Sequence, residues 1–255
     1  MTGPPLPSQS TFDALKRQDW KELTNQILAS LPRESQEYLA IHVFPVYLES
    51  GSKIYDYDQL IEYLYFATTA TASLQALLGE GLAIEVAVVG REGVVGLEAL
   101  LGNRRAVTRV VAQLPGEFLR IPLEIMRHEF NRNGVFQRLI LLFTGTLFSV
   151  VSRNSVCSAR HSVKQRFSRW LLTVHDRGGS DNIPLTQEFI AQLLGSRRAT
   201  ITLVAHELQN AKAISCSRGM TRVLDRKLLA ELACECYHLN KQDLDRYTSS
   251  TVIPI

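Results

Sequence analysis

Residues 184–224 decide the fold, and they read PLTQEFIAQLLGSRRATITLVAHELQNAKAISCSRGMTRVL. Thr186 can cap the free backbone N–H groups of a first helix, and Gly195 can end that helix in the left-handed conformation. After this tight turn, Ser196 can cap a second helix predicted over residues 197 to about 211. Its apolar residues recur at the spacing of one buried stripe: Ile201, Val204, Ala205 and Leu208. The stretch therefore predicts two short helices joined by a turn.

A predicted β-hairpin follows the two helices. Residues 214–224 alternate apolar and polar side chains around Arg218-Gly219, which is typical of two strands joined by a tight turn. A helix pair with such a hairpin behind it is a winged helix-turn-helix, in which the hairpin is the wing.

The outward face of the second helix carries side chains that can bond phosphates and base edges. Residues 160–222 hold ten Lys and Arg against four Asp and Glu, which concentrates the chain's modest net charge of +3 in this segment. Such a local excess is typical of a protein that binds the DNA backbone, so double-stranded DNA is the predicted partner. The candidate DNA-binding residues are Thr186, Gln187, Ser196, Arg197, Arg198, Thr200, Thr202, His206 and Arg218.

An alternative reading remains open for the same stretch. Helix pairs with Gly in the turn also occur in all-α domains that bind nothing, and arginines on an outer face are often simply solvated. The alternative function is a ligand-binding or protein-interaction module whose helix pair does not read DNA.

Length and composition favour two domains in the cytoplasm. The chain has 255 residues, 45% of them apolar, which is enough for a sizeable core. The start of the chain, residues 1–11, has no apolar signal-peptide core and predicts a disordered tail. Between Arg138 and Arg153 lie 14 uncharged residues, fewer than the roughly 20 that a membrane span needs, so no membrane partner is expected. Four irregularly spaced cysteines agree with a reducing compartment.

The first half of the chain predicts an antiparallel β-roll, or jelly roll. Residues 20–39 suggest two short helices separated at Leu31-Pro32. Residues 41–122 then consist of short apolar and β-branched runs divided by Gly, Asn and Asp. The predicted strands are 43–48, 64–69, 84–89, 108–114 and 117–122.

A long helix is predicted from about Leu123 to Cys157. One set of its residues alternates steps of four and three, the period of a coiled-coil seam, which predicts a homodimer. The competing interpretation is that this stripe packs on the chain's own β-domain, and both can hold because other faces are apolar too. The seam residues are Phe136, Ile140, Phe143, Leu147, Val150, Asn154 and Cys157.

The predicted fold class is therefore α+β. Its five segments are a disordered tail (1–19), a β-roll sensor domain resembling a cyclic-nucleotide-binding jelly roll (20–130), a dimerisation helix (131–158), a winged helix-turn-helix DNA-binding domain (159–240) and a tail (241–255).

This order of elements resembles the Crp/Fnr family of bacterial transcription regulators. The resemblance lies in 162–172 (SVKQRFSRWLL), 185–202 (LTQEFIAQLLGSRRATIT) and 214–221 (ISCSRGMT). It implies that Arg198 and Thr200 reach into the major groove, that a dimer binds an inverted repeat, and that RNA polymerase is a partner. Ala199 stands where many members carry a Glu that accepts from cytosine, so the family's base preference does not transfer.

The resemblance also implies an effector site, from which this sequence departs. Members that bind cyclic nucleotides hold the ribose with a Gly-Glu pair and the phosphate with an Arg-Ser/Thr pair. Here Gly96 is followed by Leu97 with the carboxylate moved to Glu98, and Arg105 is followed by Ala106. The candidate effector residues are Gly96, Glu98, Arg105 and Ala106. The altered pairs argue against a cyclic nucleotide, and no other cofactor is predicted.

Metal and enzyme chemistry find little support in the sequence. The family's iron-sulfur members use N-terminal cysteines, but no Cys precedes Cys157. Cys234 and His238 are four residues apart and could share a helical face, yet no second ligand pair was apparent, so packed core cysteines and no metal are predicted. No nucleophile-base pair or catalytic triad stands out, so an enzyme is not expected.

Overall fold

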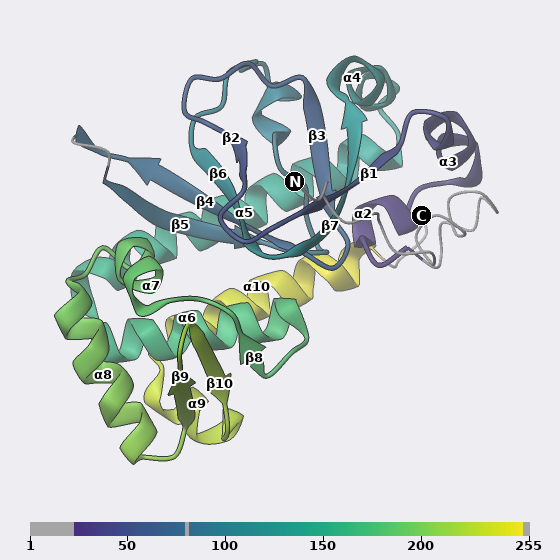
Figure 1. Cartoon of the computed structure of the whole chain (residues 1–255). Helices are drawn as coiled ribbons and strands as arrows, with labels where there is room; N and C mark the ends of the chain where they lie inside the picture. The colour runs from purple at the N-terminus through teal and green to yellow at the C-terminus, as the bar shows by residue number, and fades with distance from the viewer. Residues whose placement is uncertain (1–22, 80–81, 252–255) are drawn as a thin grey trace.

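The computed structural model describes residues 23–79 and 82–251 (Figure 1). The predicted tail at 1–19 lies outside these residues. Two short helices come first, as expected: α2 (Gln26–Ala29) and α3 (Arg33–Ala40). The β-roll follows, with β1 (Phe44–Leu48), β2 (Lys53–Tyr55), β3 (Tyr63–Ala67), β4 (Thr71–Leu77), β5 (Ala83–Val89), the single turn η3 (Leu97–Ala99), β6 (Arg109–Leu114) and β7 (Gly116–Pro122).

The β-roll consists of two antiparallel sheets. Their strand orders are β1-β7-β3 and β2-β6-β4-β5. The strands β2 and β4 were not predicted from the sequence. The polar residues Thr71, Ser73 and Gln75 of β4 are buried. The usual alternation of buried apolar and exposed polar residues is therefore not visible in the sequence of this strand. Ser73 donates to Glu85 and Thr71 accepts from the Leu114 N–H, so their burial leaves no hydrogen-bonding group unsatisfied.

The helical stretch after the β-roll is two helices, where one was predicted. The helices are α4 (Leu123–Asn131) and α5 (Val135–Arg160). Asn133 takes a positive φ of 57°, and Gly134 caps α5 in an extended conformation. A left-handed residue cannot continue a right-handed helix, so the chain changes direction there.

The predicted seam of α5 faces its own chain. Phe136, Ile140 and Phe143 are buried in the β-roll core, and Asn154 donates to the Val86 carbonyl. The assignment of this stripe to a dimer interface was therefore wrong, and the competing interpretation holds for it. A different stripe of α5 is exposed, in which Phe148 is 74% accessible. The helix is apolar on several faces, so periodicity could not say which one the β-roll covers.

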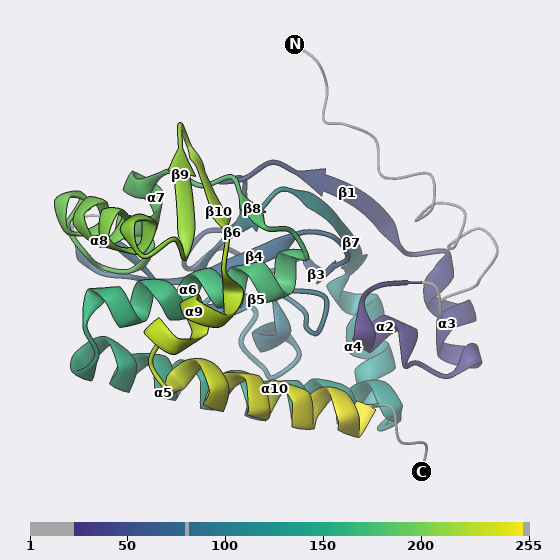
Figure 2. The same ribbon diagram turned by 90° about the horizontal axis from the view of Figure 1, so that it is seen from below.

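The predicted C-terminal tail is largely helical. The last helix, α10 (Cys236–Thr251), runs antiparallel along α5, as Figure 2 shows. Ser149 donates to Asp243 at 2.7 Å, and Arg153 pairs with Asp243 at 2.8 Å. The sequence of α10 is polar and has little apolar periodicity, so its contacts with α5 are what account for its position.

By length and composition, α5 is a helix that could cross a membrane. One of its faces is buried in the β-roll core, and its Arg153 pairs with α10. We therefore interpret α5 as a core helix of the folded chain.

Candidate nucleic-acid interface

The C-terminal part of the chain begins directly after α5. Its elements are α6 (Val163–Gly178), β8 (Asn182–Ile183), α7 (Gln187–Leu193), α8 (Arg198–Asn210), β9 (Ile214–Ser217), β10 (Met220–Val223) and α9 (Arg226–Leu232). They share a second core built around Phe167 and Trp170 of α6. Ile201, Val204, Ala205 and Leu208 of α8 are buried in it, as their spacing predicts.

The caps of the helix pair are partly as predicted. The Thr186 hydroxyl accepts from the Phe189 N–H at 3.2 Å, which confirms it as the N-cap of α7. Ser196 is not the N-cap of α8, because Arg197 holds that position without a side-chain cap bond. The backbone N–H of Ser196 instead bonds to the Ala191 carbonyl at 2.9 Å and closes the turn.

Gly195 is required in the turn between α7 and α8. Its φ is 56°, and a Cβ there would lie 3.0 Å from Ile84 Cδ1 of β5. A larger residue would be strained twice, by its backbone and by this close approach. Arg166 of α6 donates to the Leu194 carbonyl at 3.0 Å, and this bond stabilises the same turn.

The outer face of α8 is open to solvent. Arg197, Arg198, Thr202 and His206 are exposed, whereas Thr200 is half-buried. Two contacts link the two helices on this face: Thr202 donates to Gln187 at 2.8 Å, and Arg198 lies 3.6 Å from Glu188. Both groups of the Arg198 pair are 70% exposed, so a phosphate or a base could replace the carboxylate at little cost.

The wing lies beside the start of α8. Its strands β9 and β10 pair in register through the turn at Gly219, whose φ is 68°, and β8 adds a third strand to the sheet. A groove of about 400 Å³ separates the wing from α7 and α8. The groove is lined by Thr186, Gln187 and Arg198 from the helices and by Ser217 and Gly219 from the wing. Predicted residues from the start of α7 and from the start of α8 thus converge there beside the wing.

Comparison with known proteins agrees with this geometry. Residues 165–232 match the family model described as the Crp-like helix-turn-helix domain. This segment is a Crp-like helix-turn-helix domain. No curated protein matched the chain.

Solved structures of Crp/Fnr transcription regulators share the fold over about three quarters of this chain. A putative Crp/Fnr regulator from Eubacterium rectale aligns with a TM-score of 0.64 and 20% identity, over 79% of this chain and 94% of that one. FixK2 from Bradyrhizobium japonicum aligns with a TM-score of 0.65 and 16% identity, over 75% of this chain and 98% of that one. A CRP-family regulator from Thermus thermophilus aligns with a TM-score of 0.63 and 18% identity, over 74% and 96%.

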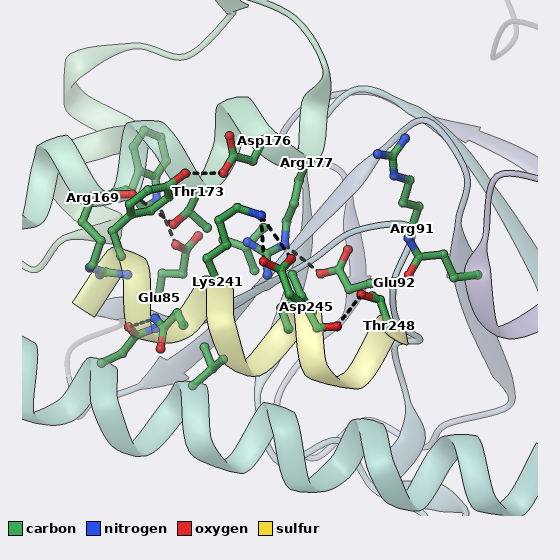
Figure 3. Close-up of a pocket in the computed structure, with 18 residues that line it drawn as sticks. Glu85, Arg91, Glu92, Arg169, Thr173, Asp176, Arg177, Lys241, Asp245 and Thr248 are labelled. Atoms are coloured by element: carbon green, nitrogen blue, oxygen red, sulfur yellow. Dashed lines mark hydrogen bonds and ion pairs between the residues drawn. The ribbon is translucent and has the colours of Figure 1, made fainter. Parts of the chain in front are cut away.

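A polar cavity lies where the Crp-like domain meets the β-roll and α10. Its volume is about 190 Å³, and Figure 3 shows charged side chains of both signs around it. Arg177 of α6 donates to Glu92, just after β5, at 2.7 Å, and both side chains are largely buried. Glu92 also accepts from the Gly90 N–H. This buried ion pair ties the domain to the β-roll.

Glu85 of β5 makes a second connection across the cavity. Its carboxylate accepts from Ser73, from Gln113 and, at 2.8 Å, from the Trp170 indole N–H of α6. Removal from water raises the pKa of Glu85 to about 7, although the hydrogen bonds from Ser73 and Trp170 act in the opposite direction.

The predicted effector residues do not form a comparable cluster. Gly96 has a φ of 88° and caps η3, and Ala106 is buried in the β-roll core. Burial raises the pKa of Glu98 on that turn. The exposed Arg105 donates to the Asp58 carbonyl at 2.6 Å instead, and no hydrogen bond or ion pair between Glu98 and Arg105 is found in the described residues.

The cysteines are arranged differently from the prediction. His238 is exposed and lies edge-on to the Tyr237 ring, so the expected neighbour of Cys234 turns away. Cys234 instead lies with Cys236, Cys157 and His161. A second ligand pair therefore does exist, and the signal that could have revealed it is the spacing of four residues between Cys157 and His161.

Proposed function

We propose that this protein is a transcription regulator that binds an inverted-repeat DNA site as a homodimer. The observation that carries the proposal is the exposed outer face of α8 beside the wing, within a Crp-like helix-turn-helix domain. The local excess of positive charge over residues 160–222 supports binding to the phosphate backbone.

The geometry suggests a division of roles within the interface. Arg197 and Arg198 lie at the amino end of α8, the part of a recognition helix that reaches base edges. Arg198 also lines the groove toward the wing, where Thr186 and Gln187 are placed to bond a phosphate. Arg218 at the tip of the wing, together with Thr202 and His206 further along α8, is exposed and completes the proposed surface.

The proposed dimer interface is the exposed stripe of α5. Its members are spaced by three or four residues, and they lie on the side opposite the buried seam. Within this stripe, Gly145 has open space around its Cα and would let a second helix approach closely. The stripe consists of Leu141, Gly145, Phe148, Ser152 and Val156. Two-fold pairing here would present two α8 helices for half-sites about one DNA turn, roughly 34 Å, apart.

The proposed route of control runs through the cavity between the β-roll and the Crp-like domain. Glu85 and Glu92 on the β-roll side contact Trp170 and Arg177 of α6, so a shift of β5 would be passed to α8 through α6. A small effector that changes the β-roll would then shift the population between DNA-competent and DNA-incompetent forms.

Selection of bound duplexes from a random pool tests this function. We expect an inverted repeat to be enriched, and we expect affinity for it to fall steeply as salt rises from 50 to 200 mM, by about a factor of a thousand if six phosphates are contacted. If no sequence is enriched and binding is insensitive to salt, the alternative of a ligand-binding or protein-interaction module is favoured.

A further inference from the structure

Four side chains that can bind a metal meet where α5, α6 and α10 approach one another. Cys157 lies near the end of α5 and His161 directly follows that helix, while Cys234 and Cys236 flank the start of α10. Their ligand atoms all lie within 4.8 Å of one another. The three cysteines are almost fully buried and all are free thiols. Residues 77 positions apart in sequence thus form one compact donor set.

Two of the separations between these ligand atoms are close to the edge lengths of a tetrahedral site. Zinc binds sulfur at about 2.3 Å and imidazole nitrogen at about 2.0 Å, so two ligand sulfurs should lie about 3.8 Å apart and a sulfur and a nitrogen about 3.6 Å apart. Here Cys157 Sγ lies 3.5 Å from Cys234 Sγ, and Cys236 Sγ lies 3.7 Å from His161 Nδ1. A disulfide would need about 2.0 Å between the sulfurs.

The surroundings of the four ligands also suit a metal. His161 Nε2 lies 3.2 Å from a Glu235 carboxylate oxygen, which would leave Nδ1 free to coordinate. This carboxylate contact is the usual arrangement behind a zinc-bound histidine. The buried Arg169 of α6 brings a positive charge close to Cys157 and Cys234, which favours the negative charge that thiolate ligands carry.

We propose that Cys157, His161, Cys234 and Cys236 bind one zinc ion. Three thiolates and one imidazole complete a tetrahedral Cys3His set, which leaves no open position for a catalytic water. The ion would therefore have a structural role. It would fasten the end of α5, where the chain enters the Crp-like domain, to the start of α10. The arrangement does not depend on whether the protein binds DNA.

Elemental analysis of the reduced, full-length protein tests the site. After gel filtration without added metal we expect about one zinc per chain, and in the Cys157→Ser and Cys234→Ser variants less than about a tenth of that. The matched control is Cys216→Ser, because Cys216 lies in the wing, outside the cluster. This control should keep the full zinc content.

A second measurement uses wild-type protein, so it does not depend on whether the variants fold. Wild-type protein is stripped with a chelator under reducing conditions and titrated with cobalt(II), which should produce a thiolate-to-cobalt charge-transfer band and raise the Tm by several degrees. A folded wild-type chain that holds no zinc and shows neither the band nor the Tm shift would overturn the proposal. A Cys157–Cys234 disulfide in protein purified under reducing conditions would overturn it as well.

Discussion

The Trp170 indole N–H donates to the Glu85 carboxylate at 2.8 Å, and this bond joins the first helix of the Crp-like domain to a strand of the β-roll. The Arg177–Glu92 pair lies about two turns further along the same face of this helix. Both acceptors are carboxylates of the β-roll side, and both donors belong to α6. Two acidic side chains of the β-roll side thus hold the Crp-like domain in position.

Stability should fall as pH rises from 4.5 to about 7, because the pKa of Glu85 is raised in the folded state. Burial raises this pKa from 4.5 to about 7, so the folded state holds a proton there that the unfolded state has lost. The corresponding stability is fully present below pH 4.5 and is lost as pH rises through about 7. The loss is at most about 3 kcal/mol, and less where water reaches the half-buried residue.

Urea unfolding at pH 5 and pH 8 measures this effect. The difference in unfolding free energy between the two pH values should be smaller in Glu85→Gln, which carries no charge at either pH. Equal differences in wild type and variant would contradict the assignment.

Removal of Arg177 should weaken the junction between the two domains. In Arg177→Ala the buried Glu92 carboxylate would keep, among the described residues, the Gly90 N–H as its one hydrogen-bond donor. The loss of one partner of a buried ion pair costs about 3 kcal/mol. Arg198→Ala is the matched control, because its ion pair with Glu188 is exposed and should contribute less than about 1 kcal/mol. Denaturant titration measures the free energy of unfolding of both variants. Equal losses would show that the Arg177–Glu92 pair stabilises the protein no more than an exposed ion pair does.

Arg198 and Lys164 should affect DNA binding in different ways. Arg198→Ala should relax sequence preference, at a cost of about 1–3 kcal/mol on the preferred duplex and little on others. Lys164, whose partner here is Glu207 at 3.0 Å, lies on α6 rather than on the recognition helix. Lys164→Ala should weaken all duplexes alike. Binding titrations on matched and scrambled duplexes decide this, and identical behaviour of wild type and Arg198→Ala would refute the role given to Arg198.

A charge in the exposed stripe of α5 should separate the protomers. Phe148→Glu places a carboxylate at the centre of the proposed dimer interface, where a second copy would bury it without a partner. Sedimentation should then show monomers where the wild type is a dimer. Ile41→Glu is the control, since Ile41 is equally exposed, lies outside α5 and should not change the assembly. A monomeric wild type at micromolar concentration would remove the basis for the dimer.

Cyclic AMP should not stabilise the protein. Arg105 is engaged by Asp58, and the residue after it is the buried Ala106, so the usual phosphate-binding hydroxyl is missing. A thermal shift assay with micromolar cyclic AMP should leave the Tm unchanged. A rise of several degrees would show that Gly96, Glu98 and Arg105 form a working pocket after all.

The sequence by itself determined the helix-turn-helix and its wing. Their signals are local: the Thr186 cap, the left-handed Gly195 and the turn at Gly219 each act within a few residues. The side chains that face outward on α8 follow from the same short-range periodicity, because the buried stripe of a helix defines its opposite face. Most candidate DNA-binding residues could therefore be named in advance.

Only the tertiary structure decided how distant segments meet. The apolar residues of α5 occupy several faces, and contact with the β-roll and α10 selected which face is buried and left Phe148 outside. The buried polar residues of β4, the helical course of α10 and the gathering of Cys157 with Cys234 likewise depend on partners dozens of residues away. Local periodicity limits which faces of an element are available, but the free energy of burying one of them depends on the surface that the rest of the chain brings against it.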